Sequence, residues 1–65
     1  MTQKDQIKVI NAGFTIIRAD YFRMGIKFKS NISTEWKTGE KGFKTKKELE
    51  ERMKKLLEHS LFIED

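Results

Sequence analysis

Apolar and polar residues alternate strictly between Phe22 and Lys29. Successive side chains of a β-strand point to opposite faces of a sheet, so this alternation predicts a strand with one buried face and one cationic, solvent-facing side. A sheet with one apolar face must be covered by a second layer of structure. The apolar side of the predicted strand carries Phe22, Met24, Ile26 and Phe28, and its other side carries Arg23, Gly25, Lys27 and Lys29.

Two further strands are predicted beside this one. Residues Phe14 to Ala19 are rich in β-branched and aromatic side chains and are too few for an amphipathic helix. Residues Ile32 to Lys37 would form the third strand, with Asp20-Tyr21 and Ser30-Asn31 as the connecting turns. Trp36 either packs in the core against a helix, which its large apolar area favours, or offers a platform on which a base could stack.

A short helix is predicted before the first strand. Thr2 is suited to cap its N-terminus, because an acid, Asp5, stands three residues later. Gly13 fits the left-handed position just beyond a helix end, where Phe14 can fold back on Val9. The helix should therefore end near Asn11 or Ala12.

A longer helix is predicted after the last strand. Thr45 and Glu48 form a capping box, in which each residue can satisfy a backbone N–H group of the first turn. The apolar residues that follow recur at helical spacing and would face the sheet. They are Leu49, Met53, Leu56 and Leu57.

These elements predict an α+β fold for a single domain of residues 1–65, with a short N-terminal helix, a three-stranded antiparallel sheet and a C-terminal helix packed on one sheet face. The apolar tail from Leu61 to Ile63 should dock on the core. The chain has no Cys, no apolar run long enough to span a membrane and no signal-like start. We therefore expect a cytoplasmic protein without membrane association.

The residue types argue against an enzyme. His59 is the single histidine and Cys is absent, so neither a nucleophile–base pair nor a three-ligand metal site can be assembled. A chain of 65 residues also leaves little volume for a ligand pocket. We expect no catalytic residue, no metal, no cofactor and no small-molecule substrate.

The net charge of +4 is concentrated in one stretch, because five lysines and one acid lie between Lys37 and Lys47. Lys46 and Lys47 would stand at the positive end of the helix dipole, where each cation is unfavourable by about 0.3–1 kcal/mol. Such a helix start suits a bound phosphate, whereas the simpler alternative is a charged surface that aids solubility. Likewise, Arg23, Lys27 and Lys29 on the sheet could contact a nucleic-acid backbone or merely discourage aggregation.

The segment Lys41 to Leu49 reads KGFKTKKEL, follows a small sheet and opens the final helix. It resembles the arm-type (AP2-like) DNA-binding domain at the N-terminus of tyrosine integrases. That resemblance implies a three-stranded sheet whose exposed face enters the DNA major groove, with Lys44 and Lys46 near the phosphates. The order of elements also resembles a double-stranded-RNA-binding domain. By the first resemblance, the residues facing DNA would be Arg23, Lys27, Lys29 and Lys37.

We therefore expect a non-enzymatic nucleic-acid-binding module, with DNA rather than RNA as its partner. The alternative is a protein-interaction or structural module, such as a homodimer, in which Ile17, Tyr21 or the Leu61–Ile63 tail meets a protein partner. The predicted nucleic-acid-binding residues are Arg23, Lys27, Lys29, Lys37, Lys41, Lys44, Lys46 and Lys47.

Overall fold

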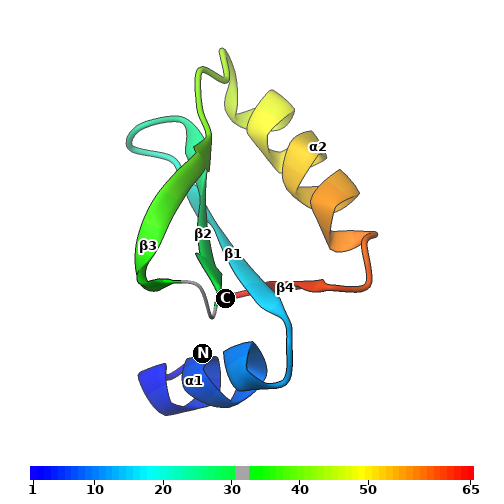
Figure 1. Cartoon of the computed structure of the whole chain (residues 1–65). Coiled ribbons are helices and arrows are strands. Elements are labelled where there is room, and N and C mark those ends of the chain that lie inside the picture. Colours follow the sequence, from blue (N-terminus) through cyan, green and yellow to red (C-terminus); the bar gives the residue numbers. More distant parts are fainter. Residues whose placement is uncertain (31–32) are drawn as a thin grey trace.

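The computed structural model describes residues 1–30 and 33–65 as two helices and a four-stranded sheet (Figure 1). The strand order is β3-β2-β1-β4, and β2 is antiparallel to both of its neighbours. The predicted α+β fold is therefore confirmed. The elements are α1 (Gln3–Asn11), β1 (Thr15–Asp20), β2 (Gly25–Ser30), β3 (Ser33–Glu40), α2 (Lys46–Leu57) and β4 (Phe62–Glu64).

The predicted sheet of three antiparallel strands is incomplete, because the apolar tail forms a fourth strand. This strand, β4, pairs with β1 in parallel, with Thr15 opposite Phe62 and Ile17 opposite Glu64. The backbone N–H of Asp65 donates to the carbonyl of Ile17 over 2.9 Å and extends this pairing. The sheet is therefore mixed. The chain passes from β3 through α2 to β4, which pairs with β1.

The main core lies between the sheet and α2. Ile17, Ile26 and Leu49 are fully buried there, and Met53 is nearly so. The burial of Ile26, Leu49 and Met53 confirms the predicted faces of β2 and α2. Three other predicted core residues are only partly buried at the edge of this cluster, namely Met24, Phe28 and Leu56.

Helix α1 covers one end of the opposite sheet face, below the rest of the molecule in Figure 1. Ile16 and Ile17 are neighbours in β1, so their side chains point to opposite faces, and both are fully buried. Ile10 of α1 is buried together with Gln6, whose side-chain oxygen accepts a hydrogen bond from Lys29 Nζ at 3.1 Å. Strand β1 is therefore buried on both faces at Ile16 and Ile17, which explains why its sequence shows no simple alternation.

Both predicted signals at the ends of α1 are confirmed. The Thr2 hydroxyl oxygen accepts a hydrogen bond from the backbone N–H of Asp5 at 3.1 Å. At the other end, Gly13 has a φ of 97°, which a residue without Cβ adopts at little cost. The N–H of Phe14 then donates to the carbonyl of Val9, as in a Schellman motif.

The capping box of α2 forms with one change of partner. The Thr45 hydroxyl oxygen accepts from the N–H of Glu48 at 3.1 Å, as predicted. The Glu48 carboxylate, however, accepts from the N–H of Lys44 instead of that of Thr45. It therefore fixes the backbone of the lysine-rich loop one residue before the helix cap.

The prediction that the second strand starts at Phe22 is wrong. Residues 21–24 form the turn between β1 and β2, and Phe22 is 94% exposed. The N–H of Arg23 donates to Asp20 Oδ1 at 3.2 Å, and Met24 has a φ of 50°, so the chain reverses before β2 begins at Gly25. Arg23 is accordingly a turn residue. The predicted turn at Ser30-Asn31 and the predicted strand position of Ile32 fall partly or wholly outside the described residues.

Candidate nucleic-acid interface

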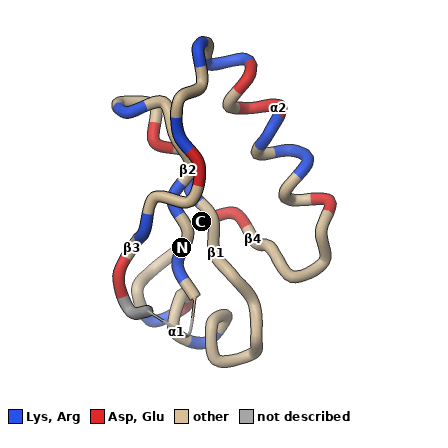
Figure 2. The backbone as a smooth tube through the Cα atoms, turned by 45° about the horizontal axis from the view of Figure 1, so that its top comes forward, with Lys and Arg blue, Asp and Glu red and all other residues tan. Residues whose placement is uncertain are grey.

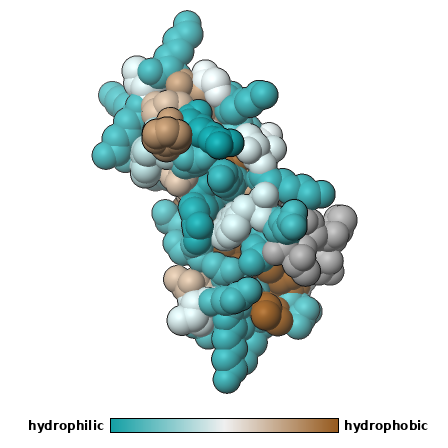
Figure 3. Space-filling view, turned by 90° about the vertical axis from the view of Figure 1, so that its left-hand side faces the viewer, coloured by the Kyte–Doolittle hydropathy of each residue, from teal (hydrophilic) through white to brown (hydrophobic). Residues whose placement is uncertain are grey.

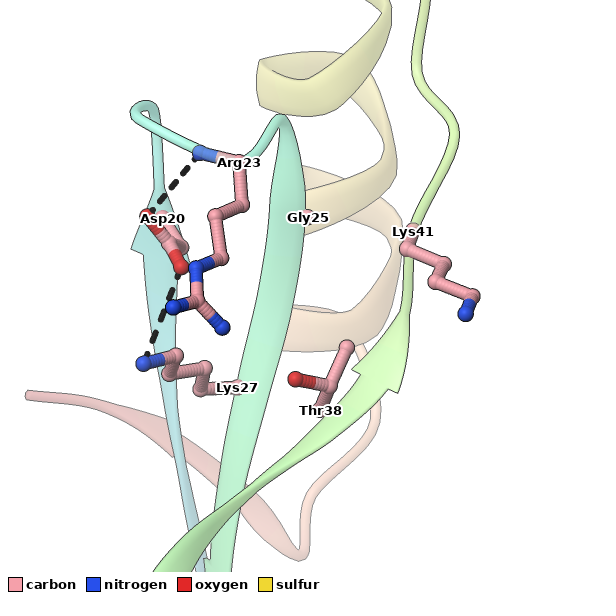
Figure 4. Close-up of a pocket in the computed structure, with 6 residues that line it drawn as sticks. All are labelled: Asp20, Arg23, Gly25, Lys27, Thr38 and Lys41. Atoms are coloured by element: carbon pink, nitrogen blue, oxygen red, sulfur yellow. Dashed lines mark hydrogen bonds and ion pairs between the residues drawn. The ribbon is translucent and has the colours of Figure 1, made fainter.

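A hollow of about 300 Å³ lies on the sheet face that points away from α2, next to the turn between β1 and β2. Figure 4 shows Arg23 and Lys27 reaching toward Asp20, with the Thr38 hydroxyl turned toward Lys27. Lys41 stands at the far rim and points outward. Two segments of the chain therefore direct cations toward Asp20, and a third segment places Lys41 at the rim. The lining residues are Asp20, Arg23, Gly25, Lys27, Thr38 and Lys41.

Asp20 organises the cationic side of this hollow. Its Oδ1 accepts from the backbone N–H of Arg23, and its Oδ2 lies 3.7 Å from Lys27 Nζ. Asp20 is the one carboxylate among the described residues that line the hollow, whereas Arg23, Lys27 and Lys41 are all cationic. The hollow therefore keeps an excess of positive charge.

A bulge in β3 determines which residues reach the hollow. Lys27 is paired with Thr38, but the preceding residue Ile26 is paired with Glu40, so Gly39 is the extra residue between them. A Cβ atom at Gly39 would overlap the ring of Phe28. The bulge places Thr38 beside Lys27 on the hollow side and turns Glu40 to the helix side of the sheet.

Glu40 is held by α2 instead of facing the hollow. Its carboxylate accepts from Arg52 Nε at 2.9 and 3.1 Å. This hydrogen bond and the charge of Glu40 raise the pKa of Arg52, against a smaller opposing effect of desolvation. The negative charge next to Lys41 in the sequence is therefore directed away from the cations of the hollow.

The predicted lysines at the start of α2 are exposed and lie at the same end of the molecule as the turn between β1 and β2 (Figures 1 and 2). Lys46 Nζ lies 5.1 Å from the centre of the Tyr21 ring, within the range of a cation–π contact. The Tyr21 hydroxyl donates to Glu50 of α2 at 3.3 Å. Partial burial and the neighbouring Glu50 carboxylate raise the pKa of Tyr21. The exposed lysines of this stretch are Lys44, Lys46 and Lys47.

The structure places the cations that were predicted to share one sheet face on two different faces. Lys37 is paired with Phe28, and paired residues of antiparallel strands share a face, so Lys37 lies on the side opposite Lys27. Lys29 does share the face of Lys27, but it is partly buried and bonded to Gln6 beneath α1. The prediction that Lys37 belongs to this face is wrong.

The prediction that Trp36 packs against the long helix is also wrong. Its ring lies on the opposite sheet face, where Arg18 Cζ is 4.4 Å and Lys29 Nζ is 5.8 Å from the ring centre. Arg18 is in turn paired with Asp65, with 2.8 Å between Arg18 Nε and Asp65 Oδ2. Trp36 and these two cations therefore form a packed cluster that is separate from the hollow.

Local sequence patterns do not identify Asp20 and Thr38 as neighbours of the cations in the hollow. Asp20 is recognisable as a turn residue, but its contact with Lys27 depends on the pairing of β1 with β2. Thr38 reaches the hollow through the β3 bulge, for which Gly39 is the one local signal.

Within residues 1–30 and 33–65, no group of three His, Cys, Asp or Glu side chains could hold a metal ion. Neither described helix is long and apolar enough to cross a membrane. Comparisons of the chain with protein-family models, curated proteins and solved structures found no match.

Proposed function

We propose that this chain binds nucleic acid by contacting the phosphate backbone of the nucleic acid, with DNA rather than RNA as its partner. The observation that carries the proposal is the placement of Arg23 and Lys27 at one hollow that Asp20 only partly neutralises, with Lys41 at its rim. These cations come from a turn, from β2 and from the residue after β3, so their grouping depends on the tertiary fold. The choice of DNA is supported by the resemblance of Lys41 to Leu49 to arm-type DNA-binding domains.

The chemistry of the hollow suits a phosphate group. A guanidinium group can donate two parallel hydrogen bonds to phosphate oxygens, so Arg23 would provide the directional contact. Thr38 offers a hydroxyl donor, and Lys41 has a flexible side chain that can fold over a ligand from the rim. The exposed lysines before and at the start of α2 would contact further phosphates of the same chain.

The alternative, a protein-interaction module, has less support. Ile17, one of its predicted contact residues, is fully buried in the core. Phe62 and Ile63 belong to β4 and are partly buried, while Tyr21 is engaged by Lys46 and Glu50. Leu61 is about half exposed, but a single leucine does not make an interface.

A pair of double substitutions tests the proposal. Arg23→Gln with Lys41→Gln removes two cations from the hollow, and Lys4→Gln with Lys8→Gln removes two exposed cations from α1. Lys27 is left unchanged because it is paired with Asp20 in the sheet. Affinity for a short DNA duplex would be measured by fluorescence anisotropy over a series of salt concentrations.

We expect the hollow variant to bind DNA more weakly and to show a slope of log K against log salt that is smaller by about 0.9 for each phosphate that is no longer neutralised. The α1 variant should keep nearly the slope of the unmodified protein. Equal losses of affinity in the two variants would mean that only overall charge matters, and the hollow would then have no specific role.

A further inference from the structure

Phe22 is the most exposed large apolar side chain in the described part of the chain, with 94% of its surface open to solvent. Aromatic rings normally contribute large buried areas to a fold, so a ring placed this way adds almost nothing to packing. The side of the molecule seen in Figure 3 is mainly hydrophilic, with hydrophobic side chains exposed in a few places. Phe22 therefore projects from the turn into solvent instead of packing on the core.

The turn that carries Phe22 is anchored on both sides. The carbonyl of Met24 accepts a hydrogen bond from the N–H of Phe43 at 3.2 Å, which ties the turn to the loop before α2. On the other side of Phe22, the Tyr21 hydroxyl donates to Glu50. The ring is thus presented from a backbone held by contacts to two other segments.

Cations are associated with both residues that neighbour Phe22 in the sequence. Arg23, the next residue, lines the hollow, and Lys46 lies over the ring of Tyr21, the preceding residue. This surface is complementary to a polyanion that also offers flat aromatic groups. A protein partner is less suitable, because stable protein interfaces bury at least about 1,200 Å², far more than one ring can supply.

We infer that Phe22 stacks on an unpaired base of a DNA strand whose phosphates contact the neighbouring cations. The inference rests on the proposed function and specifies the class of ligand, namely single-stranded DNA or DNA with an unpaired base. An unpaired base has a free π-face that an aromatic side chain can cover. Inserting the same ring into a perfect duplex would require a base step to unstack first, which makes duplex DNA the weaker ligand.

Phe22→Ala is the direct test, measured with single-stranded DNA and with a perfect duplex of the same sequence. Removing one stacked base should weaken single-strand binding by about 5- to 150-fold, as expected for an aromatic–base contact, with a much smaller change for the duplex. Phe22→Trp should retain single-strand binding. Ile7→Ala, which truncates a half-exposed side chain on α1, is the matched control and should change neither affinity.

Phe22→Ala should not destabilise the fold, because Phe22 contributes very little buried surface. The melting temperature of the variant should therefore match that of the unmodified protein. Quenching of 2-aminopurine in the strand gives an independent signal of stacking, and Phe22→Ala should abolish it.

If Phe22→Ala binds single strands as tightly as the unmodified protein, while Arg23→Gln with Lys41→Gln still weakens binding, stacking is refuted and phosphate binding stands. Equal losses of affinity for single strand and duplex would also refute stacking on an unpaired base. If the unmodified protein binds no DNA at low salt, the proposed function itself fails.

Discussion

Replacing Leu49 with Ala tests the packing of α2 on the sheet. Leu49 is fully buried against Ile17 and Ile26, so its truncation should leave a cavity at the centre of the core. Such a change costs about 2–5 kcal/mol. At roughly 0.05–0.15 kcal/mol per residue, a domain of 65 residues has a total stability of about 3–10 kcal/mol. The variant should therefore lose a large fraction of its free energy of unfolding.

Leu56→Ala is the matched control, because it makes the same chemical change on the same helix at a partly exposed position. We expect it to be clearly less destabilising than Leu49→Ala. Urea unfolding would be followed by circular dichroism and by the fluorescence of Trp36, which lies on the sheet face away from α2. If both variants were equally destabilised, or if Leu56→Ala were the less stable of the two, the described placement of α2 on the sheet would be wrong.

Two further substitutions probe the sheet. Gly39→Ala should destabilise the domain by about 1–3 kcal/mol, because its Cβ would overlap the Phe28 ring and force the bulge to shift; chemical denaturation would measure the effect, and an unchanged midpoint would argue against the bulge. Burial of the Asp65 carboxylate opposes its ionisation, but hydrogen bonds from Arg18 and Gln6 outweigh it and lower its pKa. The ionised, bonded form therefore stabilises the fold above the unfolded pKa of about 3.9, and this contribution is lost as the pH falls through the lower folded pKa. Asp65→Asn should reduce the fall in melting temperature that occurs as the pH becomes acidic. If that fall were unchanged, other carboxylates would be its cause.

Local patterns predicted the elements whose signals lie within a few residues. The caps of both helices depend on neighbours in sequence, so Thr2, Gly13 and Thr45 identified them correctly. The alternation around Ile26 likewise placed the buried side of β2. The same alternation led to a predicted strand start at Phe22 that is too early, because a period of two does not show where the turn of a hairpin ends and the strand begins.

The errors in β3 and β4 have a different cause, which is pairing between distant residues. Alternation correctly places Trp36 and Lys37 on opposite faces of β3, but only the pairing of Lys37 with Phe28 shows which of the two lies on the α2 side. Strand β4 has three residues, too few to show any period, and it forms through parallel pairing with β1. Most cations of the candidate site were recognisable as a charged set, but their division between the hollow and the Trp36 cluster follows from these pairings.

The most direct test of nucleic-acid binding is a salt titration of the unmodified protein with single-stranded DNA, duplex DNA and duplex RNA, followed by fluorescence anisotropy. Binding through phosphates predicts that log K falls linearly with log salt, and the proposed preference predicts that DNA is bound more tightly than RNA. Changing Lys44, Lys46 and Lys47 to Gln should lower the duplex-DNA slope by about 0.9 for each phosphate that these lysines neutralise, while Thr45 still caps the helix. Absence of binding to every one of these ligands at low salt, where electrostatic attraction is strongest, would contradict the proposed function.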